Sequence, residues 1–347
     1  MRRFLLILVF ICCFAAPLLA QIAPSPDAPP GGGDDTSQGP QLQTGQPVTT
    51  FKVTTNLVNL YFVARDKRGA LIPTLTKDEC VVYEDNVQQT IKNFSAQTDL
   101  PLTLGIMLDT SLSQMSVLPM EQQTGDAFLK RVMRPKDEAF LISFDLTVDL
   151  MNDFTNNPSE IARAMDKAQI VGNTSNYANG TVPDVGKPKG TVLYDAIYLA
   201  SNDKLSRESG RKALILLTDG QDEGSQESEN SAIESAQKAD AINYVLLISD
   251  PGAYRMFAYA GESAMHRLAD ATGGQVFTIG SNGKKMEGAF EEIESELRTQ
   301  YLVSYTPTNK KVDGTYRKIR VECTQNGQKL RVQARQGYYA IAHDSNQ

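Results

Sequence analysis

The feature that most constrains the fold is a regular alternation of short apolar segments and longer amphipathic segments between positions 102 and 298. The first apolar run, at 102–108, is not interrupted by charged side chains, as is typical of a strand covered on both faces. Such alternation predicts a mainly parallel sheet with helices on both faces, because parallel strands need crossover connections. Strands are expected at 102–108, 140–144, 148–151, 213–217, 244–248 and 275–279, and helices at 120–133, from 157 onward, 191–201, 228–240, 262–271 and 286–298.

Segments with strand periodicity flank this α/β unit on both sides. Each flank has too few strands to form a good core alone. We therefore expect the flanks, 51–98 and 300–340, to pair as one β-sandwich-like domain, with the α/β domain at 99–299 inserted between them. Asn326-Gly327 has the composition of a two-residue hairpin turn. The flanking strands are expected at 53–63, 80–83, 88–94, 302–305, 316–323 and 329–335.

Two cysteines lie in these flanking strands. Cys323 shares a strand face with Ile319 and Val321, and Cys80 shares one with Val82. If both faces belong to the core of the β domain, the two cysteines could meet and pair in an oxidising compartment. The alternative is that both are small buried apolar residues.

The N-terminus has the composition of an export signal followed by a tether. Arg2 and Arg3 precede an apolar run at 4–16, and the signal is expected to span 1–20, with an uncleaved membrane anchor as the alternative. Residues 21–50 contain six prolines and five glycines, which favours a flexible linker. The protein is thus expected in the periplasm, at the cell surface or outside the cell.

The charge balance argues against several classes of function. A net charge of −7 and a pI near 5.1 give no electrostatic footprint for nucleic acid. His266 and His343 have no cysteine or histidine at ligand spacing, so the sequence gives no support for a zinc site built from these residues.

Three polar segments lie at the ends of expected strands or at the start of an expected helix, where a ligand site would form. They are Asp109-Thr110-Ser111-Leu112-Ser113, Gly190-Thr191 and Thr218-Asp219-Gly220. In open α/β sheets, ligands bind at the carboxyl ends of strands, near the point where the strand order reverses. Taken singly, each segment has a simpler interpretation as a helix cap or a strand-end turn. Their joint occurrence in this order favours a common site.

The pattern Asp-x-Ser-x-Ser, a distant Thr and a later Asp-Gly resembles the metal-ion-dependent adhesion site of von Willebrand factor A (VWFA) domains. The chain is most similar to a bacterial, exported VWFA-related family with flanking β segments. Leu75-Thr76-Lys77-Asp78, the segment Gly-Thr-x-Leu-Tyr-Asp-Ala at 190–196 and the strand Tyr-x-Val-x-Tyr at 301–305 match that family. The resemblance covers 51–339.

This resemblance implies a Rossmann-like VWFA domain that binds a divalent cation, Mg²⁺ first and Mn²⁺ or Ca²⁺ as alternatives. It implies direct coordination by Ser111, Ser113 and Thr191, and coordination through water by Asp109 and Asp219. Hard cations prefer such oxygen ligands. It also implies a protein partner that completes the site with an Asp or Glu carboxylate, and therefore binding rather than catalysis.

One position departs from the family pattern. Leu112 stands where glycine is common, so an apolar side chain is expected at the rim of the site. Asp145, Asp222 and Glu223 are interpreted as solvated charges bordering the site, and Asp195 as stabilising a helix N-terminus. The loop at 173–189 is a candidate for partner specificity.

Two other functions are alternatives to metal-dependent binding of a partner. A structural envelope protein with an unoccupied metal site fits the same fold. A hydrolase fits less well, because Ser111 stands where a haloacid-dehalogenase-like phosphatase needs a second aspartate, and because helices surround the aspartates that an aspartic protease would place on β-hairpin loops.

Overall fold

The computed structural model describes residues 57–96, 100–170, 190–248 and 255–340. The chain divides into two units, 1–53 and 54–347, and all described residues belong to the second. The expected export signal at 1–20, the linker at 21–50 and the specificity loop at 173–189 lie outside the described residues.

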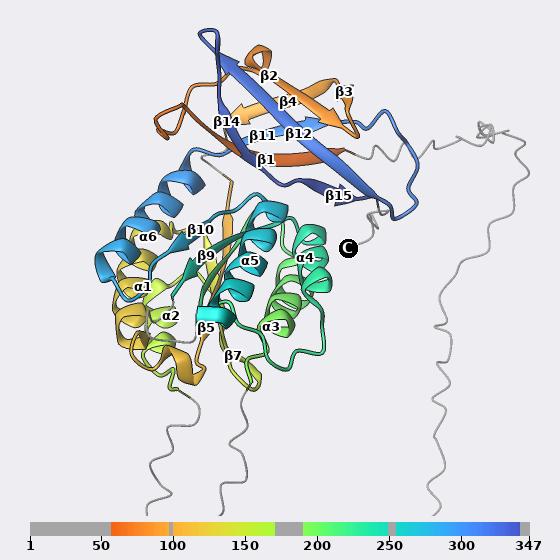
Figure 1. Ribbon diagram of the computed structural model, residues 1–347. Coiled ribbons are helices and arrows are strands. Elements are labelled where there is room, and N and C mark those ends of the chain that lie inside the picture. Colours follow the sequence, from red (N-terminus) through yellow and green to blue (C-terminus); the bar gives the residue numbers. More distant parts are fainter. Residues whose placement is uncertain (1–56, 97–99, 171–189, 249–254, 341–347) are drawn as a thin grey trace, which may run out of the picture. The chain divides into compact units, whose positions relative to one another are not determined.

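A six-stranded sheet forms the centre of the α/β part, in the order β10-β9-β8-β5-β6-β7 (Figure 1). All neighbouring pairs are parallel except β6 and β7. The chain leaves β5 toward β6 on one side and returns to β8 on the other, so the strand order reverses at β5. The fold is therefore mixed α/β with a mainly parallel central sheet, as the alternation predicted. The strands are β5 (Leu102–Asp109), β6 (Glu138–Phe144), β7 (Val148–Thr155), β8 (Arg211–Thr218), β9 (Ala241–Leu247) and β10 (Val276–Thr278).

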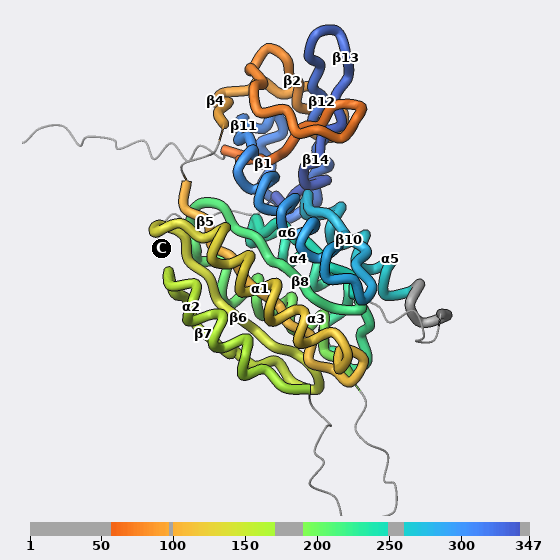
Figure 2. The backbone as a smooth tube through the Cα atoms, turned by 90° about the vertical axis from the view of Figure 1, so that its left-hand side faces the viewer, coloured from red at the N-terminus to blue at the C-terminus, as the bar shows by residue number. Residues whose placement is uncertain are grey.

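Helices cover both faces of this sheet. The face seen in Figure 2 is packed by α1 (Leu118–Val132), α2 (Pro158–Met165) and α6 (Gly283–Arg298). The opposite face is packed by three further helices, and a short π-helix, η4 (Ala200–Leu205), continues the first of them. These helices are α3 (Leu193–Leu199), α4 (Glu229–Lys238) and α5 (Arg255–Thr272).

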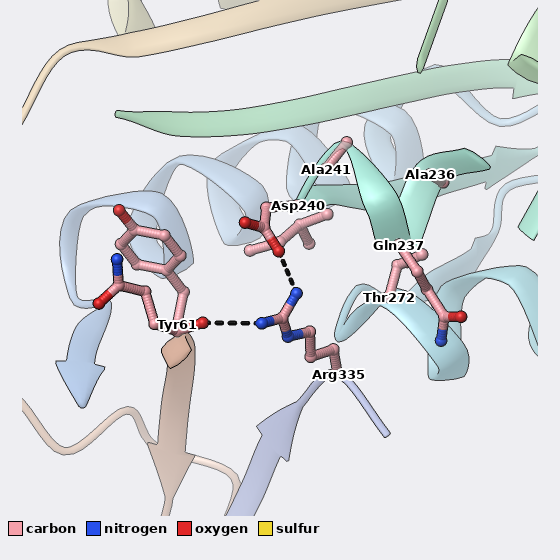
Figure 3. Close-up of a pocket in the computed structure, with 9 residues that line it drawn as sticks. Tyr61, Ala236, Gln237, Asp240, Ala241, Thr272 and Arg335 are labelled. Atoms are coloured by element: carbon pink, nitrogen blue, oxygen red, sulfur yellow. Dashed lines mark hydrogen bonds and ion pairs between the residues drawn. The ribbon is translucent and has the colours of Figure 1, made fainter. Parts of the chain in front are cut away.

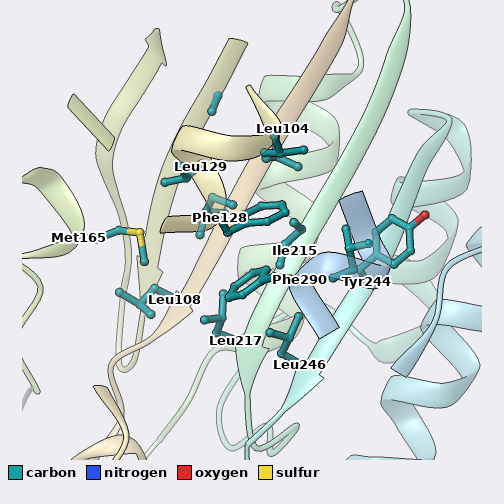
Figure 4. Packing of buried hydrophobic residues seen from close by; sticks show 14 of the residues in the cluster. Leu104, Leu108, Phe128, Leu129, Met165, Ile215, Leu217, Tyr244, Leu246 and Phe290 are labelled. Atoms are coloured by element: carbon teal, nitrogen blue, oxygen red, sulfur yellow. The ribbon is translucent and has the colours of Figure 1, made fainter. Parts of the chain in front are cut away.

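The strands supply both cores through their alternating side chains. Leu104 and Leu108 point toward the α1 face, whereas Met107 joins the core on the other side. Phe128 of α1 and Phe290 of α6 stack over the sheet with ring centroids 4.4 Å apart (Figure 4). Burial on both faces explains why the strand sequences are apolar without alternation.

Two antiparallel sheets combine strands from the two flanks of the chain. The first has the order β14-β1-β11-β4, and the second has the order β13-β12-β2-β3, with β15 paired to β12. Apolar side chains from both sheets share one core. Asn326 and Gly327, both with positive φ, form the predicted hairpin turn. The strands are β1 (Val58–Arg65), β2 (Cys80–Glu84), β3 (Val87–Gln89), β4 (Ile91–Ala96), β11 (Tyr301–Tyr305), β12 (Tyr316–Gln325), β13 (Gln328–Lys329), β14 (Arg331–Ala334) and β15 (Gly337–Tyr339), and a single 3-10 turn, η1 (Lys77–Glu79), precedes β2.

Two expected strands were wrong in their extent. The segment 88–94 is split at Thr90, because β3 pairs with β2 in one sheet and β4 pairs with β11 in the other. The segment 329–335 is split at Leu330 for the same reason, since β13 pairs with β12 and β14 pairs with β1. Each split marks a place where the chain crosses from one sheet to the other.

The predicted meeting of the two cysteines is confirmed. Cys80 of β2 and Cys323 of β12 are directly opposed in the antiparallel register and form a disulfide across 243 residues of chain. The bond therefore joins the strands that precede the α/β part to those that follow it.

Polar contacts connect the antiparallel sheets to the α/β part. Arg335 forms an ion pair with Asp240, at the end of α4, and donates to the carbonyl of Asn59 at 2.9 Å (Figure 3). Arg65 of β1 pairs with the buried carboxylate of Glu296 of α6 at 2.6 Å. The cavity beside Arg335, about 20 Å³, has room for one water molecule and offers no ligand site.

None of the described helices combines the length and the apolar character that a membrane crossing requires.

Candidate metal centre

Asp109 is the last residue of β5 and lies at the carboxyl edge of the central sheet. Its side chain is completely buried. One carboxylate oxygen accepts the hydroxyl proton of Thr218, at the end of β8, at 2.7 Å, and the other accepts the backbone N–H of Ser111 at 3.0 Å. Two adjacent strands therefore fix the orientation of this carboxylate at the point where the strand order reverses.

Ser111 caps the short 3-10 helix η2 (Leu112–Gln114), and Ser113 lies within it. Their hydroxyl oxygens are hydrogen-bonded to each other at 2.9 Å. Two adjacent ligands of an octahedral Mg²⁺, each bound at about 2.1 Å, lie about 3.0 Å from one another. The spacing of the two hydroxyls thus fits neighbouring positions on one small cation.

Thr191 is buried and is positioned by contacts of its backbone. Its N–H donates to the carbonyl of Glu223 at 3.2 Å, and the N–H of Glu223 donates back to the carbonyl of Thr191 at 2.9 Å. The next residue, Val192, donates to the carbonyl of Asp145 at 2.8 Å. The threonine segment is thereby attached both to the loop that follows Asp219 and to the end of β6.

Asp145 was interpreted as a solvated charge, and that was wrong. Its side chain is buried, and it accepts the hydroxyl proton of Thr110 at 2.7 Å. Thr110 also donates its N–H to the carbonyl of Phe144 at 2.9 Å. Asp145 therefore holds the start of the Asp-x-Ser-x-Ser loop. A signal was present in the sequence, because Asp145 follows an apolar strand as Asp109 does.

The other acidic residues near the site have different roles. Asp222, also interpreted as solvated, accepts the N–H of Tyr194 at 3.1 Å at the start of α3. Asp195 accepts two backbone N–H groups, from Gln226 at 3.1 Å and from residue 227 at 2.8 Å, in the loop before α4. Glu223 has an exposed side chain, as expected of a solvated charge.

Two buried carboxyl groups, those of Asp109 and Glu121, lie behind the loop. Burial, followed by repulsion from Asp219, raises the pKa of Asp109 to about 7, although hydrogen bonds from Ser111 and Thr218 oppose the shift. Burial and repulsion from Asp109 also raise the pKa of Glu121 of α1. No basic side chain among the described residues offsets either carboxyl group. A cation would supply the missing positive charge.

The ligand chemistry here is that of hydroxyls. Within the ranges that the structure describes, no group of three or more His, Cys, Asp or Glu side chains is arranged to hold an ion. The oxygen groups that the sequence predicted for this edge are the hydroxyls of Ser111, Ser113 and Thr191 and the carboxylates of Asp109 and Asp219. Leu112 and Met115, at the rim of the same loop, are 41% and 48% exposed.

Gly220 controls the position of the loop that bears Asp219. It has a φ of +78°, and a Cβ at this position would lie 3.0 Å from the backbone of Gly261 in α5. We expect Gly220→Ala to lower the free energy of unfolding by about 2–3 kcal/mol. The control is Gly314→Ala, with a φ of +72° and open space around the Cβ, which should cost only about 1 kcal/mol. Urea unfolding of both variants measures this, and equal losses would contradict the close approach.

No protein-family model and no curated protein sequence matches the chain. Among solved structures, it is similar to the conserved hypothetical protein BatB from Bacteroides thetaiotaomicron, with 16% identity and a TM-score of 0.43 over 57% of this chain and 99% of BatB. It is also similar to proximal thread matrix protein 1 from the mussel byssus, whose structure has zinc in a metal-ion-dependent adhesion site (MIDAS) motif. That match has 17% identity and a TM-score of 0.46 and covers 62% of this chain and 50% of the mussel chain. A third similarity, to the PilB minor pilin from Streptococcus sanguinis, has 13% identity and a TM-score of 0.41, over 58% of this chain and 62% of the pilin.

Proposed function

We propose that this chain is an exported VWFA-type protein that binds a protein partner through a divalent cation. In this proposal Ser111, Ser113 and Thr191 bind the cation directly, and Asp109 and Asp219 hold its water ligands. The observation that supports it most is the 2.9 Å separation of the two serine hydroxyls beside a buried, oriented carboxylate. Mg²⁺ is the proposed ion, because hard divalent cations prefer oxygen ligands such as these hydroxyls.

The choice of ligands determines how a partner would bind. Serine and threonine hydroxyls are neutral, so they leave much of a cation's charge uncompensated. When bound, the cation supplies that charge and an open coordination position for a carboxylate of an Asp or Glu on the partner. The protein's own residues orient the ion and present the exposed Leu112 beside it. This arrangement favours binding over catalysis.

We further propose that the antiparallel sheets form one domain from 51–98 and 300–340, with the VWFA domain at 99–299 inserted into it. The pairing of β1 with β11 and of β2 with β12 supports this division. The composition of residues 1–20 supports export, and the linker at 21–50 would then separate the folded part from its exit site.

Partner capture tests the proposed function. The full chain is immobilised and exposed to an envelope extract of the source cells, with Mg²⁺ or with EDTA. We expect a partner that is retained with Mg²⁺ and released by EDTA, and that is lost from the variant Ser113→Ala. Retention that is equal under all three conditions would overturn the proposal and favour a structural protein with an unoccupied site.

The affinity for Mn²⁺ is expected to fall as the pH falls below about 7, by roughly tenfold per pH unit. The reason is that the pKa of Asp109 is raised to about 7 in the metal-free protein, so a proton must leave before the cation binds. Titrations at pH 5.5, 6.5 and 7.5 measure this dependence. An affinity that is constant over this range would contradict it.

The raised pKa of Asp109 also affects the stability of the metal-free protein, but in the opposite direction: stability falls as the pH rises, whereas the affinity for Mn²⁺ increases. The folded-state pKa of Asp109 lies above the unfolded value of about 3.9, so its protonation favours the folded state. That contribution is fully present below about pH 4 and is lost as the pH rises through 7. In Asp109→Asn, this part of the pH dependence should disappear from urea unfolding curves measured in EDTA.

A further inference from the structure

Glu121 is a buried carboxylate that no interaction in the described part of the chain explains. It lies in the first turn of α1, is 0% exposed, and has no hydrogen-bond partner for either carboxylate oxygen within the described residues. Gln114, at 1% exposed, is likewise unpartnered at both polar side-chain atoms within those residues. The backbone N–H of Val117 donates to the backbone carbonyl of Gln114, and the N–H of Glu121 donates to the carbonyl of Val117. The three residues therefore lie on successive turns of the chain.

Packing alone does not account for a carboxylate at this position. A charge transferred from water into an apolar interior is strongly disfavoured unless it is paired. Other buried side chains of the same helix, such as Leu118 and Phe128, are apolar. An apolar side chain of similar size would fill the same space without that penalty.

The backbone connects Glu121 to the serine loop of the proposed centre, because Gln114 also donates its N–H to the carbonyl of Ser111 at 3.0 Å. Glu121 therefore lies about one helical turn beyond the short helix that carries the serine hydroxyls. Repulsion from Asp109 raises its pKa further than burial alone does. The cation of the proposed centre would supply the positive charge that balances this carboxylate.

We propose that Glu121 is a buried counter-charge for the bound cation, which increases the affinity of the centre through space without providing a ligand atom. This inference rests on the proposed metal binding and deepens it. Glu121 thus acts on the cation only through its charge and does not touch it. It gives the centre a third interior carboxylate beside Asp109 and Asp219, and so a preference for ions of higher charge.

The variant Glu121→Gln, which keeps the shape of the side chain, tests this proposal with Mn²⁺ and Tb³⁺ as probes. We expect the dissociation constant for Mn²⁺ to rise by about ten- to a hundredfold. Because Coulomb energy is proportional to the charge of the ion, the logarithm of the loss for Tb³⁺ should be about 1.5 times that for Mn²⁺.

The matched control is Glu291→Gln on α6, whose carboxylate is 67% exposed and pairs with Arg131 of α1 at 3.6 Å. It should leave both dissociation constants within about twofold, because surface charges are screened. Glu121→Met, also uncharged, should reproduce the loss seen with Gln.

The outcomes separate the two proposals. If the parent protein binds Mn²⁺ and Glu121→Gln binds it within twofold as tightly, the counter-charge role is wrong and the metal centre stands. An equal loss for Mn²⁺ and Tb³⁺ would also overturn that role, since it would indicate a change of packing. If the parent binds neither ion, the proposed function itself is overturned.

Discussion

Replacement of Asp109 with alanine is expected to reduce the affinity for Mn²⁺ by at least about a hundredfold and to abolish the stabilisation that the metal gives. Three effects combine in this variant. One of the two carboxylates of the proposed centre is lost, the hydroxyl of Thr218 loses its acceptor, and the backbone N–H of Ser111 loses the acceptor that orients the serine loop. Loss of a buried, hydrogen-bonded carboxylate that also balances a cation reduces metal affinity by about this much.

Thermal unfolding in EDTA and then in excess Mn²⁺ measures this loss. A ligand that binds only the folded state stabilises it by about 2.7 kcal/mol at a hundred times its dissociation constant. The parent should therefore melt at a higher temperature with Mn²⁺, and Asp109→Ala should melt at the same temperature in both conditions. Asp222→Asn is the control, because asparagine can still accept the N–H of Tyr194 and the residue is outside the proposed ligand set. An Asp109→Ala variant that responds to Mn²⁺ like the parent would contradict the assignment.

Removal of the disulfide, by the double substitution Cys80→Ser and Cys323→Ser, is expected to lower the free energy of unfolding by about 3–5 kcal/mol. The bond closes a loop of 243 residues, and long loops restrict the unfolded chain most. It also joins β2 to β12, which come from opposite flanks of the chain. Without the bond, only packing and hydrogen bonds connect these two strands.

Urea unfolding of the double variant and of the parent with a reducing agent measures the contribution of the disulfide. Both should show the same shift to lower urea, because both lack the bond. The control is the double variant with reducing agent, which should show no further change. A loss below about 1 kcal/mol, or alkylation of Cys80 and Cys323 in the unreduced, denatured parent, would contradict the disulfide's role.

Much of the α/β part could be predicted from the sequence, because its strands are buried on both faces and are apolar throughout. The run at 102–108 ends at Asp109, and that change of composition is sufficient to place the site at a strand end. The flanking β segments were harder. Around Thr90 the strand-like pattern continues without a break, and only the pairing of β3 and β4 with different partners shows that the chain changes sheets.

The roles of the interior polar residues were harder to predict. Asp145 follows an apolar strand as Asp109 does, but its burial depends on Thr110, which lies 35 residues earlier. Glu121 lies in the first turn of a helix, where an acidic side chain is usually explained by the helix dipole at the surface. Its burial follows from the packing of α1 against the sheet, which local composition does not encode.

In the proposed centre, hydroxyls from separate loops meet on one cation. Crystals grown with Mn²⁺, with diffraction measured at the manganese absorption edge, would locate this ion. We expect one anomalous peak about 2.0–2.3 Å from the hydroxyl oxygens of Ser111 and Ser113, with Thr191, Asp109 and Asp219 around it. A structure with Mn²⁺ bound elsewhere, and none between these two serines, would contradict it.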